Sequence, residues 1–246
     1  MKNREIQHTV LSLYDYTGVA VTPWAEQGYT CYCYDIQHDA NEVKEKHFPN
    51  GGIIYYVHAD LHEWETICAL FNAFENENIA FAMAFPVCTD MAVSGAAHFE
   101  SKRKINPNFQ AEAIMFAKWC AELFDDLEVP YYIENPVSVL ATQWRKPDYR
   151  FHPYEFGGYI PENEAEHPLY PDYIAPRDAY TKRTCLWTGY GFKMPETLPV
   201  DCESYGSSRQ HRKLGGKSAK TKNIRSATPR GFANAIYHAN GEGLAK

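Results

Sequence analysis

The sequence has no long apolar run, no paired cysteine motif and no glycine-rich dinucleotide loop. No apolar stretch reaches the ~18 residues that a membrane span needs, and the polar start MKNREIQHTV lacks the hydrophobic region of a signal peptide. The 7 cysteines are irregularly spaced without a pair of CxxC motifs, so neither a zinc site nor a disulfide framework is indicated. No Gly-x-Gly-x-x-Gly follows the first expected strand, which argues against a dinucleotide-dependent dehydrogenase. We therefore expect reduced thiols, a cytoplasmic setting, and neither a metal nor a membrane as partner.

Acidic residues are missing from one part of the chain. No Asp or Glu occurs between residues 204 and 241, although the whole chain has a net charge of −7. A basic segment on an acidic body indicates either contact with a polyanion or a solvated, flexible loop. The positive residues of this segment are Arg209, Arg212, Lys213, Lys217, Lys220, Lys222, Arg225 and Arg230.

The first half of the chain alternates β-like apolar runs with helix-like segments. The expected strands are 9–14, 29–35, 53–57, 79–85, 131–134 and, later, 184–187. The expected helices are 21–27, 39–47, 61–77, 107–127 and 229–240, the last with Pro229 in its first turn and Thr228 as its cap. This alternation predicts an α/β fold, with a mostly parallel sheet and helices on both faces.

The 246 residues suffice for one substantial domain, or for one domain with a small appendage. Residues 1–192 are expected to form the core. Residues 193–225 form a short basic insert that is the best candidate for an inserted or mobile segment. Residues 226–246 are expected to return to the core as a C-terminal helix.

Two reactive side chains follow apolar runs that resemble buried strands. Cys88 lies in Phe-Pro-Val-Cys-Thr after the run ending at Phe85, and Glu134 opens Glu-Asn-Pro after the run ending at Ile133. Strand ends of this kind meet at the carboxyl edge of an α/β sheet, where ligands bind. A thiol beside a carboxyl group suits attack on an electron-poor ring carbon while an acid protonates the ring. The alternative is that Cys88 is a small core residue and Glu134 a turn residue.

Five further motifs occur in a fixed order around this pair. Tyr14-Asp15-Tyr16-Thr17-Gly18 follows the first strand, and Asp35 and Asp60 end the second and third. Lys182-Arg183-Thr184 precedes the last strand, and Ser226-Ala227-Thr228 precedes the last helix. In this order, with Pro86-Val87-Cys88 and Glu134-Asn135-Pro136, they resemble the cytosine-C5 DNA methyltransferase family, and within it the small forms encoded by bacteriophages.

The resemblance implies a Rossmann-like fold that binds S-adenosylmethionine, and DNA as the substrate, in the cytoplasm of the host cell if a phage encodes the chain. Cys88 would attack C6 of a flipped cytosine, Glu134 would protonate or hydrogen-bond N3, and Arg183, together with Lys182, would hold O2. The residues that the resemblance assigns to the cofactor are Tyr14, Thr17, Gly18, Asp35, Asp60, Pro86, Ser226 and Thr228.

The chain departs from the family pattern in three places. Tyr16 replaces the first glycine of the cofactor loop, and Arg183 is the one arginine kept from a block that has two. The interval from Trp187 to Arg225, where the family holds its DNA-reading domain, has only about 40 residues. If DNA is the substrate, base reading should be short or relaxed and basic side chains must contact the phosphates. The expected phosphate contacts are Lys102, Arg103, Lys104, Arg209, Arg212, Lys213, Lys217, Lys220 and Lys222.

Two other hypotheses remain open on these residues. The short interval is also compatible with RNA or a free nucleotide as the methyl acceptor. The altered loop at Tyr16 and the reduced arginine block are compatible with a catalytically inert nucleic-acid-binding relative. Retention of both Cys88 and Glu134 argues against the inert form.

Overall fold

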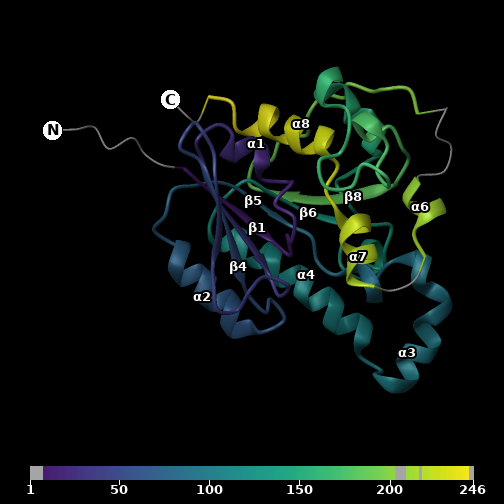
Figure 1. Cartoon of the computed structure of the whole chain (residues 1–246). Coiled ribbons are helices and arrows are strands. Elements are labelled where there is room, and N and C mark those ends of the chain that lie inside the picture. The colour runs from purple at the N-terminus through teal and green to yellow at the C-terminus, as the bar shows by residue number, and fades with distance from the viewer. Residues whose placement is uncertain (1–7, 203–208, 216–217, 244–246) are drawn as a thin grey trace.

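The computed structural model describes residues 8–202, 209–215 and 218–243 (Figure 1). Within these residues, eight strands form one mixed sheet in the order β3-β4-β2-β1-β5-β6-β8-β7. The strands are β1 Thr9–Leu13, β2 Thr30–Asp35, β3 Lys44–His47, β4 Ile53–His58, β5 Ile79–Ala84, β6 Tyr131–Pro136, β7 Tyr149–Phe151 and β8 Thr184–Gly189. The chain is therefore an α/β protein, as the alternation predicted.

The five central strands are parallel, and the strands outside them are antiparallel to their neighbours. Parallel pairing joins β4, β2, β1, β5 and β6, whereas β3, β8 and β7 pair in the antiparallel sense. Strand β2 pairs with β1 on one side, and β5, which comes later in the chain, pairs with β1 on the other side. The carboxyl ends of β1 and β5 therefore flank a topological switch point, where ligands bind in open α/β sheets.

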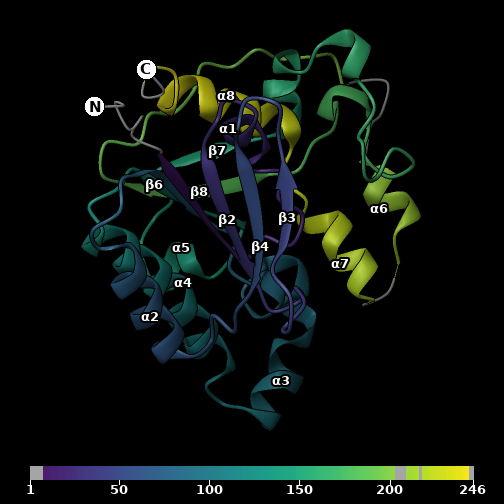
Figure 2. The same ribbon diagram turned by 60° about the vertical axis from the view of Figure 1, so that its left-hand side comes forward.

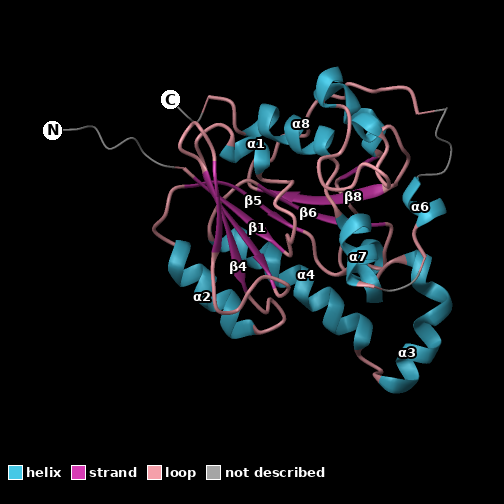
Figure 3. Ribbon diagram, viewed as in Figure 1, coloured by secondary structure: helices cyan, strands magenta, loops and turns pink. Residues whose placement is uncertain are grey.

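Helices cover both faces of the sheet (Figures 1 and 3). The helices are α1 Thr22–Ala25, α2 Trp64–Phe74, α3 Phe99–Ile105, α4 Phe109–Asp126, α5 Leu140–Gln143, α6 Arg209–Lys213, α7 Ala219–Ser226 and α8 Arg230–Asn240. In Figure 1, α1 and α8 lie above the sheet, and α2 and α4 lie below it.

Successive residues of the buried strands pack into two separate cores. Leu11 of β1 joins the core with Ile67 of α2 on one face. Val10 joins the core with Trp24 of α1 and Phe232 of α8 on the other face. Because both faces are covered, the central strands are mostly apolar, which explains why their sequences show runs rather than alternation.

Two expectations about local structure were wrong. Residues 39–47 do not form a helix, because Lys44–His47 pair with β4 as the exposed edge strand β3. Charged side chains on such an edge protect it from pairing with other chains. The last helix begins at Arg230 with Pro229 as its cap residue, so Thr228 does not cap it. Thr228 is instead buried at the sheet edge.

The basic segment is helical where the structure describes it. Ser218 caps α7 by accepting a hydrogen bond from the Thr221 N–H at 3.2 Å, and Ile224 of α7 is fully buried. Figures 1 and 2 place α7 beside the ends of the central strands, with α3 farther out on the same side. This arrangement brings the C-terminal basic residues to the edge where Cys88 and Glu134 lie.

Candidate active site

Cys88 and Glu134 meet at the carboxyl edge of two neighbouring parallel strands. Ala84, the last residue of β5, pairs with Ile133 of β6, so the residues that follow them emerge side by side. Cys88 begins a short 3-10 helix that ends at Asp90, and its side chain is half-buried. The Glu134 carboxylate is close enough to raise the pKa of the Cys88 thiol. The neighbouring ends of β5 and β6 thus carry the two residues to the same edge of the sheet.

Hydrogen bonds fix the two loops that carry this pair. The Asn135 side-chain amide donates to the Pro86 carbonyl at 2.9 Å. The Val93 N–H donates to the Val137 carbonyl, and the Val139 N–H donates to the Met91 carbonyl, both at 3.0 Å. The segment after β5 is thus joined to the segment after β6, which restricts how far Cys88 can move from Glu134.

Burial raises the pKa of both Cys88 and Glu134, and the charge of Lys182 lowers both. Burial raises the pKa of Cys88 first, the Glu134 carboxylate raises it further, and the Lys182 ammonium lowers it. Burial also raises the pKa of Glu134, and Lys182 again lowers it. A raised pKa brings Glu134 closer to the protonated form that can donate to a ring nitrogen. Lys182 is the cation that favours the thiolate.

Lys182 and Arg183 occupy different environments at the start of β8. The Lys182 Nζ donates to the Arg225 carbonyl of α7 at 3.1 Å, and its charge acts on both Cys88 and Glu134. Arg183 is exposed, and its charge acts on Cys185. Of the two residues that the sequence assigned to the substrate ring, Lys182 is the one whose charge acts on Cys88 and Glu134.

A narrow pocket lies at the same edge of the sheet, between the ends of β1 and β2 and the end of α7. It holds about 30 Å³, room for about two water molecules. A hydrogen bond of 3.1 Å joins two of its walls, from the Asn223 amide to the Gln37 side-chain oxygen. The residues that line it are Tyr14, Asp15, Tyr16, Thr17, Asp35, Gln37, Phe85, Asn223, Ser226 and Thr228.

Five of the eight expected cofactor residues line this pocket: Tyr14, Thr17, Asp35, Ser226 and Thr228. The other three take neighbouring positions. Gly18 has a φ of 67°, and a Cβ there would lie 2.7 Å from the Tyr56 hydroxyl oxygen, so both the backbone conformation and the space favour glycine. Asp60 is partly exposed and accepts a hydrogen bond from the His62 N–H at 3.0 Å. Pro86 contributes its carbonyl to the Asn135 contact.

Asp15 organises the loop after β1, and sequence reasoning missed it. Its buried carboxylate accepts hydrogen bonds from the Ser12 hydroxyl and the Gly18 N–H, each at 2.8 Å, and from the Thr17 N–H at 3.1 Å. Burial raises its pKa, and these donors oppose the rise. In the sequence, the one indication of this role is that an acidic residue lies between two tyrosines, just after a buried strand.

The expected phosphate-contacting residues fall into two groups. Several have partners within the chain: Lys102 with Asp90, Arg103 with Gln110, Lys104 with Glu100, Arg209 with the Pro171 carbonyl and Lys213 with the Asp172 carbonyl. Lys220 and Lys222 of α7 are exposed, and the Lys220 Nζ lies 5.8 Å from the centre of the Tyr173 ring. Lys217 and the side chain of Arg212 lie outside the part of the chain that the structure describes.

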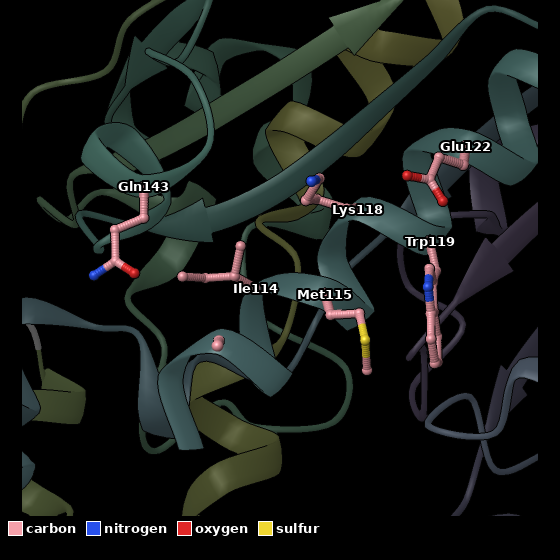
Figure 4. Close-up of a pocket in the computed structure, with 7 residues that line it drawn as sticks. Ile114, Met115, Lys118, Trp119, Glu122 and Gln143 are labelled. Atoms are coloured by element: carbon pink, nitrogen blue, oxygen red, sulfur yellow. The ribbon is translucent and has the colours of Figure 1, made fainter. Parts of the chain in front are cut away.

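A larger hollow, of about 410 Å³, lies along α4, and neither Cys88 nor Glu134 lines it (Figure 4). Ile114, Met115 and Trp119 give it an apolar surface, and Lys118, Glu122 and Gln143 form its polar rim. No cysteine, serine or histidine lines it. The reactive groups converge at the sheet edge, and we therefore place the candidate site there.

No family model and no curated protein matches the chain. In the described part of the chain, no helix is long and apolar enough to cross a membrane. The same residues contain no group of three or more His, Cys, Asp or Glu side chains that could hold a metal ion. A function for this protein is therefore inferred from its own residues and their geometry.

Proposed function

We propose that this protein is an S-adenosylmethionine-dependent methyltransferase that acts on C5 of cytosine in DNA through a covalent bond to Cys88. The observation that carries the proposal is the meeting of Cys88, Glu134 and Lys182 at the strand edge, next to the pocket that contains Asp35. The order of the five parallel strands, with a switch point between β1 and β5, supports a Rossmann-like methyltransferase fold.

The pocket residues fit the nucleoside part of the cofactor. Asp35 is buried at the end of β2, where a carboxylate accepts hydrogen bonds from ribose hydroxyls. Phe85 and Tyr16 supply aromatic surface. When bound, S-adenosylmethionine supplies the methyl group. Binding requires the pocket walls to separate at the Asn223–Gln37 hydrogen bond, because a nucleoside needs far more room than the pocket now holds.

The chain's own groups account for activation of the ring. Cys88, as the thiolate that Lys182 favours, would form a bond to C6 of the cytosine. Glu134 would give or share a proton with N3, which makes C6 electron-poor, and Lys182 would hold O2. After C5 gains its methyl group and loses its proton, the bond to Cys88 would break and the ring would become aromatic again. A base in a stacked duplex cannot reach these groups, so it must be flipped out.

The position of the basic helix favours a nucleic-acid strand over a free nucleotide, and the order of the motifs favours DNA over RNA. Lys220 and Lys222 are exposed on α7, the helix whose Arg225 carbonyl holds Lys182. A strand bound to α7 would therefore pass close to the Cys88 pair. The short insert leaves RNA or a free nucleotide as the second candidate, because little chain is present to read a duplex.

The test is methyl transfer from labelled cofactor to four acceptors: duplex DNA, single-stranded DNA, transfer RNA and dCMP. The account predicts 5-methylcytosine in DNA with the parent protein and none with Cys88→Ala, while both proteins bind the cofactor equally. Transfer by Cys88→Ala would exclude Cys88 as nucleophile. Transfer to RNA or dCMP alone would select the second candidate, and no methyl transfer to any of the four would support a binding protein.

A further inference from the structure

The carboxylate at the end of β2 already has a partner from its own loop. Asp35 is 7% exposed, and its Oδ1 accepts one hydrogen bond from the Gln37 N–H at 2.8 Å and another from the Gln37 side-chain amide at 3.2 Å. The backbone contact is that of an ordinary turn after a strand. The side-chain contact is additional, and it places an amide donor on the carboxylate that the proposed function assigns to the ribose hydroxyls.

The far end of the Gln37 side chain is held by a distant part of the chain. Its Oε1 accepts a hydrogen bond of 3.1 Å from the Asn223 side-chain amide of α7, which lies 186 residues away in sequence. Both residues line the narrow pocket, which holds about 30 Å³. A single side chain thus joins the Asp35 carboxylate to the basic helix, at the wall of the space that a nucleoside would enter.

Neighbouring contacts fix the backbone of the loop that carries Gln37. The His38 ring stacks on the Tyr16 ring with 5.6 Å between their centres, and a His38 ring nitrogen lies 3.2 Å from the Asp15 carbonyl oxygen. Gln37 itself is exposed. Because its backbone is anchored and its side chain reaches solvent, the side chain can turn aside without unfolding the loop.

We propose that Gln37 is an internal competitor of the cofactor, held on Asp35 by Asn223. This inference rests on the proposed function. In the free protein the Gln37 amide donates to Asp35, and the ribose hydroxyls of S-adenosylmethionine replace that donor on binding. The Gln37 side chain then leaves Asp35, its contact with Asn223 breaks, and α7 separates from the loop after β2. Because only the open form binds, its fraction sets the apparent affinity.

The same contact restrains α7 when no ligand is bound. Asn223 lies one position beyond Lys222 on this helix, and both Lys222 and Lys220 are exposed. A protease that cleaves after these lysines needs the helix to open locally, and the rate of cleavage then follows the population of the open form. Release of Gln37 should therefore be measurable in the free protein, with neither cofactor nor nucleic acid present.

The first test measures S-adenosylmethionine binding by calorimetry on the full chain. Gln37→Ala keeps the backbone N–H that Asp35 accepts, so the turn is preserved while the competing amide is removed. We expect this variant to bind about fivefold more tightly, the effect of one neutral hydrogen bond. Adding Asn223→Ala to Gln37→Ala should change little more, because Asn223 acts through Gln37. The matched control is Gln27→Ala, an exposed glutamine that does not line the pocket.

The second test is limited trypsin digestion of the free proteins, with mass measurement of the peptides cut after Lys220 and Lys222. Gln37→Ala should be cut at these positions about fivefold faster than the parent, although the substitution is far away in sequence. Gln27→Ala should be cut at the parental rate. Equal melting temperatures for the parent and both variants would show that the change is local.

The outcomes separate this inference from the proposed function. If the parent binds S-adenosylmethionine and Gln37→Ala binds it more weakly, Gln37 is a ligand contact and not a competitor. Equal binding together with equal digestion would also overturn the inference. If no protein binds S-adenosylmethionine, the proposed cofactor is wrong and the competitor role falls with it, while faster digestion of Gln37→Ala would still show that Gln37 restrains α7.

Discussion

Replacing Lys182 by glutamine should raise the pKa of Cys88, because it removes the cation that favours the thiolate. In the native chain, burial and the Glu134 carboxylate raise this pKa, and the Lys182 ammonium opposes them. Glu134→Gln removes a charge that acts in the other direction and should lower the pKa of Cys88. The two variants therefore make opposite predictions for a single thiol.

The magnitude follows from the position of Lys182. Its side chain is only half-buried, so solvent screens part of its charge, and the lost attraction is that of a screened ion pair, roughly 1 kcal/mol, rather than that of a dry one. At a pH below the pKa of the thiol, a loss of this size lowers the thiolate fraction about fivefold. Since the thiolate is the reactive form, the alkylation rate should fall by about the same factor.

The assay is carbamidomethylation at a series of pH values, followed by proteolysis and mass measurement of the Cys88 peptide. Cys68, a partly exposed thiol on α2, serves as the internal standard, because its rate should not respond to either substitution. Lys182→Arg keeps the positive charge and should keep the parental profile. This experiment needs neither cofactor nor nucleic acid, so it tests the geometry of the site independently of its proposed function.

Two outcomes would refute the reasoning. An unchanged pH profile in Lys182→Gln would mean that the ammonium does not face the thiol. A shift of the same sign in Lys182→Gln and Glu134→Gln would mean that both substitutions disturb the loop rather than remove opposite charges.

Three further predictions concern stability, cofactor and DNA. Burial raises the pKa of Asp178 to about 6 from 3.8, so its carboxyl favours folding below the unfolded value and this contribution is lost as pH rises through 6. Asp178→Asn keeps an acceptor for the Gly231 N–H. In urea unfolding, this variant should be more stable than the parent by roughly 2–3 kcal/mol at pH 7 and equally stable near pH 3. Equal stability at both pH values would contradict the cost of burying the carboxylate. Asp35→Ala should weaken S-adenosylmethionine binding by about 1.5–3 kcal/mol in calorimetry, and an unchanged dissociation constant would place the ribose elsewhere. Neutralising Lys220 and Lys222 together should lower the slope of log DNA affinity against log salt by up to about two, whereas an unchanged slope would make α7 a solvated surface.

The sheet could be predicted from sequence because its central strands are buried on both faces. Continuous apolar runs followed by polar residues mark such strands, and these runs predict that Cys88 and Glu134 lie at one edge of the sheet. The edge strand β3 was not predictable in this way. Its residues Lys44–His47 are all exposed, so their sequence shows no alternation of apolar and polar residues.

The parts of the site that sequence missed depend on contacts between distant segments. The choice of Lys182 over Arg183 depends on where α7 places the Arg225 carbonyl. Asp15 resembles an ordinary loop residue until its carboxylate is seen to bind the backbone that follows it. None of these contacts leaves a periodic signal along the chain.

The most direct test of the account is mass measurement of the adduct between the protein and a DNA strand that contains 5-fluorocytosine, in the presence of S-adenosylmethionine. The fluorine cannot leave C5 as a proton does, so the bond to the enzyme persists. We predict one protein joined to one strand carrying an added methyl group, with the linkage on the Cys88 peptide and no adduct with Cys88→Ala. A linkage on another cysteine, or no linkage when both ligands are bound, would contradict the central claim.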